Sequence, residues 1–138
     1  MLALNVCSGY PDMPTLAFDE VDAGIGGQTA RSVGKLLKQL AFEHQVLVVT
    51  HLAQVAAFAD QHFYVEKIEQ DGRTTTNIQQ LDAAEREAEL ARMLSGSDSA
   101  TAIAHAKELL QESQQQSIDA KKTTKTTKKK QLAGAGHV

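Results

Sequence analysis

Two short apolar runs on either side of an amphipathic segment constrain the fold of this chain more than any other feature. The first run, residues 15–18, is halted by Asp19-Glu20, and the second, residues 45–50, is rich in β-branched side chains. Between them, apolar residues recur at helical spacing from Val33 to Ala41. Strand, helix and strand in this order predict a βαβ unit with a right-handed crossover and two parallel strands. Runs this apolar also predict strands that are buried on both faces.

The segments that follow predict a hairpin and helices packed beside this unit. We expect a short helix over residues 53–59, then strands over 62–66 and 73–78 around the turn Gln70-Asp71-Gly72. Asp82 and Glu85 have the spacing of a capping box, which predicts a helix start. Ala84, Ala88, Ala91 and Leu94 are expected to lie on one face of that helix. A last helix is expected from about Ala100 to Glu112, with its buried face formed by Ile103, Ala106, Leu109 and Leu110. The predicted fold class is therefore α/β.

The charge of the chain is distributed unevenly. Residues 1–120 hold 17 acidic and eight basic side chains, a net charge of −9, whereas six lysines fall within residues 121–130. A Lys/Thr tract has no apolar side chains to bury, so we expect residues 118–138 to form a disordered tail after a folded region of residues 1–117. Such a tail either keeps the protein in solution or contacts nucleic acid phosphates. The acidic remainder does not have the composition of a DNA-binding domain.

Features of secreted and membrane proteins are missing from the sequence. No apolar run approaches the roughly 20 residues that a membrane-spanning helix needs, and no basic region precedes the first apolar residues. The single cysteine, Cys7, cannot form an internal disulfide and is expected to be a buried structural thiol. These observations predict a protein of the reducing cytoplasm, with no membrane partner.

Polar side chains capable of chemistry follow both predicted strands. Asp19-Glu20 ends the first strand and Thr50-His51 ends the second. Because ligands of parallel sheets bind beyond the carboxyl ends of the strands, these groups are expected to share one crevice. Two carboxylates and an imidazole suit metal-assisted hydrolysis at a phosphate. The alternative for each group alone is structural, since carboxylates after strands often cap helices and single histidines are usually structural.

The two strands and their following residues resemble motifs of the ABC-type ATPases. Residues 15–22, TLAFDEVD, resemble the Walker B strand and the D-loop, and residues 48–51, VVTH, resemble the switch-histidine strand. Further segments resemble the RecN family of DNA repair ATPases within this superfamily, and they lie at residues 18–27, 50–62, 89–96 and 104–110. The resemblance covers roughly Met1 to Gln111. It implies the carboxy-terminal part of an SMC-like, ABC-type P-loop NTPase head, with a parallel βαβ core, a hairpin and two helices, acting in recombinational repair of DNA double-strand breaks.

The resemblance also implies roles for four residues. Asp19 would organise Mg²⁺, mainly through water, and Glu20 would be the general base for the attacking water. His51 would contact the γ-phosphate of ATP, and Asp22 would communicate with a second head across an ATP sandwich. The implied cofactors are ATP and Mg²⁺. The implied partners are a second copy of the head and DNA bound by the full assembly, at the nucleoid.

Two motifs of a complete head have no counterpart in this sequence. The chain has no stretch of the form G-x-x-x-x-G-K-[ST], which cradles the triphosphate, and no Ser-Gly-Gly signature. The glycine cluster Gly24-Ile25-Gly26-Gly27 follows the carboxylates and is interpreted as the D-loop and helix entry. We therefore expect no ATPase activity from this chain alone. Two alternatives stay open: a head of another SMC or ABC-type ATPase, and an inactive module that only binds a partner head.

Overall fold

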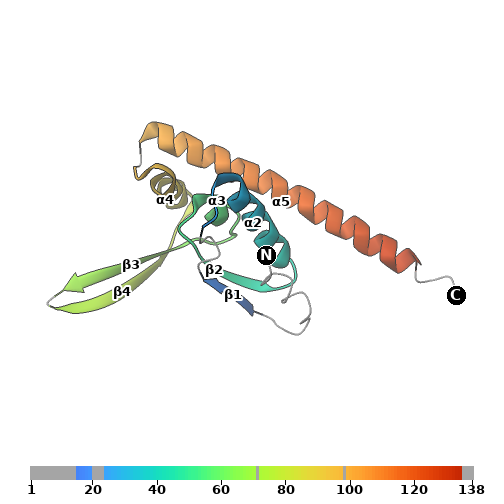
Figure 1. Ribbon diagram of the computed structural model, residues 1–138, viewed down its shortest axis with the longest axis horizontal. Coiled ribbons are helices and arrows are strands. Elements are labelled where there is room, and N and C mark those ends of the chain that lie inside the picture. Colours follow the sequence, from blue (N-terminus) through green and yellow to red (C-terminus); the bar gives the residue numbers. More distant parts are fainter. Residues whose placement is uncertain (1–14, 20–23, 71, 98, 135–138) are drawn as a thin grey trace.

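The structure, a computed structural model, describes residues 15–19, 24–70, 72–97 and 99–134 (Figure 1). Its helices and strands follow the predicted order. They are β1 (Thr15–Asp19), α2 (Gly27–Leu40), β2 (Gln45–Val49), α3 (Ala53–Ala56), β3 (Phe63–Gln70), β4 (Arg73–Gln80), α4 (Ala83–Ser95) and α5 (Ala100–Gly134). Cys7, expected to be a buried structural thiol, lies outside the described residues.

The predicted βαβ unit is confirmed. Strands β1 and β2 pair in parallel, with Thr15 opposite Gln45 and Asp19 opposite Val49, and α2 connects them. One face of this pair packs against α2 and α3 (Figure 1). The shared core consists of Ala30, Leu37 and Val55, with Phe18, Ile25, Val33, Val46, Val48 and Leu52 packed against it.

Burial of these strands on both faces is a prediction that the structure contradicts. Ala17 is exposed on the other face of the pair, and Leu47 and Val49 are 54% and 66% exposed. The reason is that α2 and α3 cover only one face, and no other described helix or strand covers the opposite one. The apolar residues that suggested double burial thus form an open apolar face.

A second core lies between α3, α4 and α5. It contains Ala53, Ala56, Ala57, Leu90, Ala91, Ala102, Ala106 and Leu109. Helix α4 begins as predicted, because the Asp82 side chain accepts a hydrogen bond from the Glu85 backbone N–H at 2.8 Å and the Glu85 carboxylate accepts one from the Asp82 backbone N–H at 2.9 Å. Ala84 lies apart from the buried part of α4. It is exposed in the first turn of α4, because α3 and α5 meet this helix around Leu90 and Ala91.

The hairpin extends away from these two cores (Figure 1). Strands β3 and β4 pair antiparallel, with Phe63 opposite Gln80 and Val65 opposite Ile78, so both strands are longer than predicted. Helix α3 is shorter than predicted and ends at Ala56, and the chain continues to Ala59 in tighter turns, in which the Ala59 N–H bonds to the Ala56 carbonyl at 3.1 Å.

Helix α5 is longer than predicted. It spans 35 residues and continues past Glu112 to Gly134, so the predicted helix end is wrong and the predicted boundary at residue 117 falls inside a helix. The sequence predicted a disordered Lys/Thr tract, whereas the structure places it in α5. No glycine or proline interrupts residues 100–133, and Ser113, beyond the predicted end, is buried against α3 at 2% exposure. None of the described helices is long and apolar enough to cross a lipid bilayer.

Candidate functional site

The carboxyl ends of β1 and β2 bring two of the predicted site residues to one edge. Asp19 is the last residue of β1 and is paired in register with Val49, the last residue of β2. His51 follows two residues later, and both Asp19 and His51 are exposed. Because neighbouring strands lie about 4.8 Å apart, the predicted sharing of one sheet edge is confirmed for Asp19 and His51.

The turn that presents His51 is defined by a local hydrogen bond. The Leu52 backbone N–H donates to Thr50 Oγ1 at 3.0 Å, which turns the chain from β2 directly into α3. Leu52 packs against the core of the βαβ unit, and Ala53 is buried at the start of α3. His51 thus projects from a short connection that is fixed on both sides.

The other two predicted site residues, Glu20 and Asp22, lie outside the described residues. The description resumes at Gly24, whose φ of 75° is in the left-handed region that favours glycine. Helix α2 then starts at Gly27. The interpretation of this glycine cluster as a helix entry is confirmed.

The described residues offer few metal ligands. No group of three His, Cys, Asp or Glu side chains among them could hold a metal ion. Asp19 is a single exposed carboxylate, which suits a hydrated Mg²⁺ whose other ligands are water and phosphate oxygens.

A groove of about 520 Å³ lies between α2, α3 and α5. It is polar, and Arg31 and Lys35 line it. Arg31 is already paired with Glu112 at 2.8 Å, which ties α2 to α5. Neither Asp19 nor His51 lines the groove, so its position gives no support to a role in phosphate hydrolysis.

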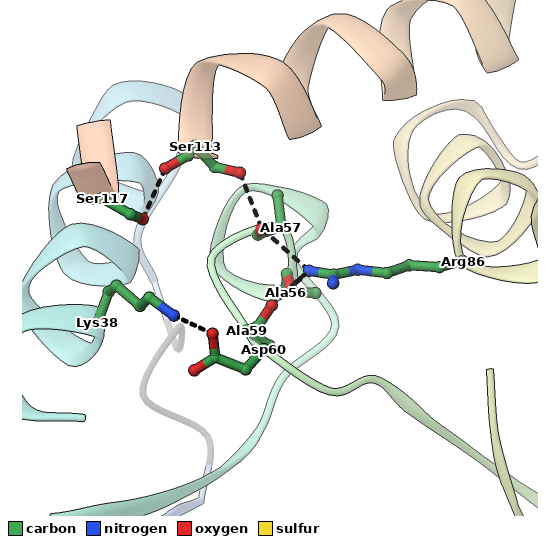
Figure 2. Close-up of polar contacts among 8 residues, drawn as sticks. All are labelled: Lys38, Ala56, Ala57, Ala59, Asp60, Arg86, Ser113 and Ser117. Carbon is green, nitrogen blue, oxygen red and sulfur yellow. Dashed lines mark hydrogen bonds and ion pairs between the residues drawn. The ribbon is translucent and has the colours of Figure 1, made fainter. Parts of the chain in front are cut away.

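A set of contacts that the sequence analysis missed surrounds the end of α3 (Figure 2). Arg86 Nη2 donates to the carbonyls of Ala56, Ala57 and Ala59, at 3.2, 3.1 and 2.7 Å. Arg86 lies four residues before the fully buried Leu90, on the same face of α4. The sequence signal that could have revealed this contact is the placement of Arg86 one helical turn before the apolar Leu90.

Further polar groups lie around this contact. Lys38 on α2 forms an ion pair with Asp60, next to the carbonyl of Ala59 (Figure 2). Burial lowers the pKa of the Arg86 guanidinium, and the Asp60 carboxylate raises it. Burial also lowers the pKa of His62, the positive charge of Arg86 lowers it further, and Glu89 partly offsets both. His62 is therefore held neutral beside a cation.

The sequence matches proteins named DNA repair protein RecN. The protein from Deinococcus radiodurans is 54% identical over 110 residues and that from Streptomyces coelicolor is 51% identical over 113 residues, each covering 80% of this chain. The Bacillus subtilis protein is 41% identical over 117 residues, or 83% of this chain. This chain is homologous to part of RecN.

The chain spans about a fifth of the length of these RecN relatives, between 19% and 20%. No family model matches it. A solved structure described as "Structural biochemistry of ATP-driven dimerization and DNA stimulated activation of SMC ATPases" overlaps 59% of this chain and 48% of its own, with a TM-score of 0.49 and 22% identity. Homology to RecN thus rests on the sequence matches, and the activity of whole RecN is a proposal for this chain.

Proposed function

We propose that these residues contribute the hydrolysis side of an ATP-binding head in a RecN-like DNA repair ATPase. The observation that carries the proposal is the parallel pairing of β1 and β2, which puts Asp19 and His51 at one edge of a region homologous to RecN. The proposed cofactors are ATP and Mg²⁺. The proposed partners are a second head, bound through an ATP sandwich, and DNA bound by the complete assembly.

Each side chain has a separate task in this proposal. Asp19 orients the water shell of Mg²⁺, which when bound would offset charge on the phosphate oxygens. The Glu20 carboxylate accepts a proton from the attacking water, which makes that water a better nucleophile. The His51 imidazole donates a hydrogen bond to a γ-phosphate oxygen, where negative charge is concentrated. Asp22 contacts the second head.

The sequence of this chain contains no loop that would hold the triphosphate of ATP. A triphosphate is normally held by backbone N–H groups and a lysine of a glycine-rich loop, and no G-x-x-x-x-G-K-[ST] stretch occurs among the 138 residues. Asp19 and His51 by themselves offer one carboxylate and one imidazole, which is too little to bind MgATP tightly. Turnover is therefore expected only when another segment supplies the cradle.

A joined protein, in which this chain is combined with the rest of a RecN relative, tests the proposal. Residues 1–120 would replace the matching segment of the Deinococcus radiodurans RecN, and ATP turnover would be measured with and without DNA ends. We expect turnover in the joined protein, its loss in an Asp19→Ala variant, and no change in the control Glu108→Ala, an exposed carboxylate of α5. Turnover at the wild-type rate in Asp19→Ala would reject the site. Turnover that DNA ends do not stimulate would favour another ABC-type head.

The open apolar face of the β1–β2 pair supports a second candidate function. Exposed Leu47 and Val49 on this face suit a surface that binds another polypeptide. In this alternative the chain binds a partner head without hydrolysing ATP. A joined protein that binds ATP and a second head, yet shows no turnover in its wild-type form, would favour the alternative.

A further inference from the structure

The helix that follows His51 is too short to fix its own position. Helix α3 contains four residues, Ala53–Ala56, and a single turn of helix is unstable in water. It is nevertheless almost fully enclosed, since Val55, Ala56, Ala57 and Phe58 are all buried. The orientation of this segment therefore depends on its neighbours, and any displacement of it would reach His51, two residues before its start.

The carbonyl end of α3 is held by a guanidinium from another helix. Carbonyls at the end of a helix lack partners within the helix. The carbonyls of Ala56, Ala57 and Ala59, at and just beyond the end of α3, converge on Arg86 Nη2 at 2.7–3.2 Å, and that of Ala56 also accepts from the Ala59 N–H at 3.1 Å. Ser113 Oγ also lies 2.9 Å from the Ala57 carbonyl oxygen. A cation at this end also interacts favourably with the partial negative charge of the last carbonyls.

These contacts join parts of the chain that are far apart in sequence. Arg86 comes from α4 and Ser113 from α5, while Lys38 of α2 pairs with Asp60 just beyond the same turn (Figure 2). Gly34 brings α2 into close contact with α3 from another side, because a Cβ atom at this position would lie 2.5 Å from Phe58 Cδ2. The segment after His51 is thus held by three helices.

We propose that Arg86 is a positioning residue for His51: by fixing the carbonyl end of α3, it keeps the imidazole at the edge it shares with Asp19. The carbonyl of Ala56 lies five residues after His51, and the residues between them form one packed unit. The hydrogen bond from the Leu52 N–H to Thr50 Oγ1 fixes the end of this unit that is next to His51. Loss of Arg86 leaves three carbonyls without this donor, so the segment relaxes and His51 moves with it. The placement of His51 stands on this geometry, whereas its effect on ATP turnover rests on the proposed function.

The proposal is tested first on the 138-residue chain. Ring signals of the five histidines would be recorded by NMR, with His51 identified by its loss in His51→Gln. In Arg86→Ala we expect the His51 ring signal to move. Arg86→Lys should return part of the shift, because the three carbonyls converge on one nitrogen and an ammonium group can replace it.

The matched control is Arg92→Ala. Arg92 lies on the same helix, its side chain is 56% exposed, and it pairs with Glu89 at 2.6 Å. Its removal should leave the His51 signal unchanged. An unchanged His51 ring signal in folded Arg86→Ala and Arg86→Lys would overturn the proposal. Unfolding of both Arg86 variants, with Arg92→Ala folded, would also overturn it by assigning Arg86 to fold stability alone.

The second test measures ATP turnover in the joined protein. Because a displacement of about 1 Å at a reacting centre costs up to a hundredfold in rate, we expect Arg86→Ala to lower kcat ten- to a hundredfold and to leave KM for ATP within twofold. If His51→Ala does not affect turnover, the proposed function fails while a moved His51 signal still supports positioning. If His51→Ala abolishes turnover but both Arg86 variants keep the wild-type kcat and His51 signal, the positioning proposal alone fails.

Discussion

Replacing Gly34 with alanine should destabilise this protein, even though alanine is the better helix former. Gly34 is buried in the middle of α2, where that helix approaches α3. A Cβ atom at position 34 would lie 2.5 Å from Phe58 Cδ2 and 3.0 Å from the Gln54 carbonyl oxygen. Contacts this short cannot persist, so either the Phe58 ring moves or the two helices separate.

Two opposing free-energy changes decide whether Gly34→Ala stabilises or destabilises the protein. Alanine in place of a mid-helix glycine gains about 1 kcal/mol in helix propensity. Overpacking of a close-packed interior costs about 1–3 kcal/mol, and the upper half of that range applies here because one neighbour is backbone and Phe58 is only 6% exposed. The net expectation is a loss of about 1–2 kcal/mol in the free energy of unfolding.

Urea unfolding followed by circular dichroism at the helix band measures this loss. With a urea dependence of about 1–2 kcal/mol per molar, the midpoint of Gly34→Ala should fall by roughly 1 M. Ser32→Ala is the matched control, because it introduces alanine at an exposed position of the same helix and should not lower the midpoint. Adding Phe58→Leu to Gly34→Ala should recover part of the loss. A midpoint of Gly34→Ala at or above the wild-type value would refute the close approach of α2 and α3.

Three further predictions concern other parts of the fold. Burial lowers the pKa of His62 below its ordinary value of 6.5, so the unfolded chain binds the proton more tightly than the folded chain. The contribution of His62 to stability should therefore be full above pH 6.5 and decrease as the pH falls toward the folded pKa. Urea midpoints of His62→Gln should lack this part of the decrease. Asp82→Ala removes the capping box of α4 and should cost about 1 kcal/mol in the same urea assay, whereas an unchanged midpoint would contradict the cap. The double variant Leu47→Thr/Val49→Thr should reduce self-association in sedimentation experiments, because both side chains lie on the open face of the β1–β2 pair. Its free energy of unfolding should change little for the same reason. Equal self-association of variant and wild type would show that this face is not responsible.

Local patterns in the sequence were sufficient to predict most elements. The βαβ unit followed from two apolar runs and one amphipathic segment, and the structure confirms its parallel register. The start of α4 followed from Asp82 and Glu85, because a capping box is complete within four residues. Asp19 and His51 could be placed at one edge for a similar reason, since parallel strands aligned by a crossover end on the same side.

Features that depend on distant residues could not be predicted in this way. Strand composition reports whether a side chain is apolar, but not whether a second layer covers it, so the open face at Leu47 and Val49 was missed. The three carbonyls bound by Arg86 are separated from it by 27 to 30 residues. The length of α5 was underestimated because the Lys/Thr tract has no apolar side chains to bury. Ser113, beyond the expected helix end, is nevertheless buried and donates to the Ala57 carbonyl, a contact across 56 residues.

The central claim is that the residues after β1 hydrolyse ATP in a RecN-like head, and Glu20 tests it most directly. In the joined protein, Glu20→Gln removes the proposed base but keeps the size of the side chain. Nucleotide binding and turnover would be measured together, with Glu108→Gln as the control. The account predicts that Glu20→Gln binds ATP as tightly as wild type and loses nearly all turnover. Turnover of Glu20→Gln at the wild-type rate would contradict it.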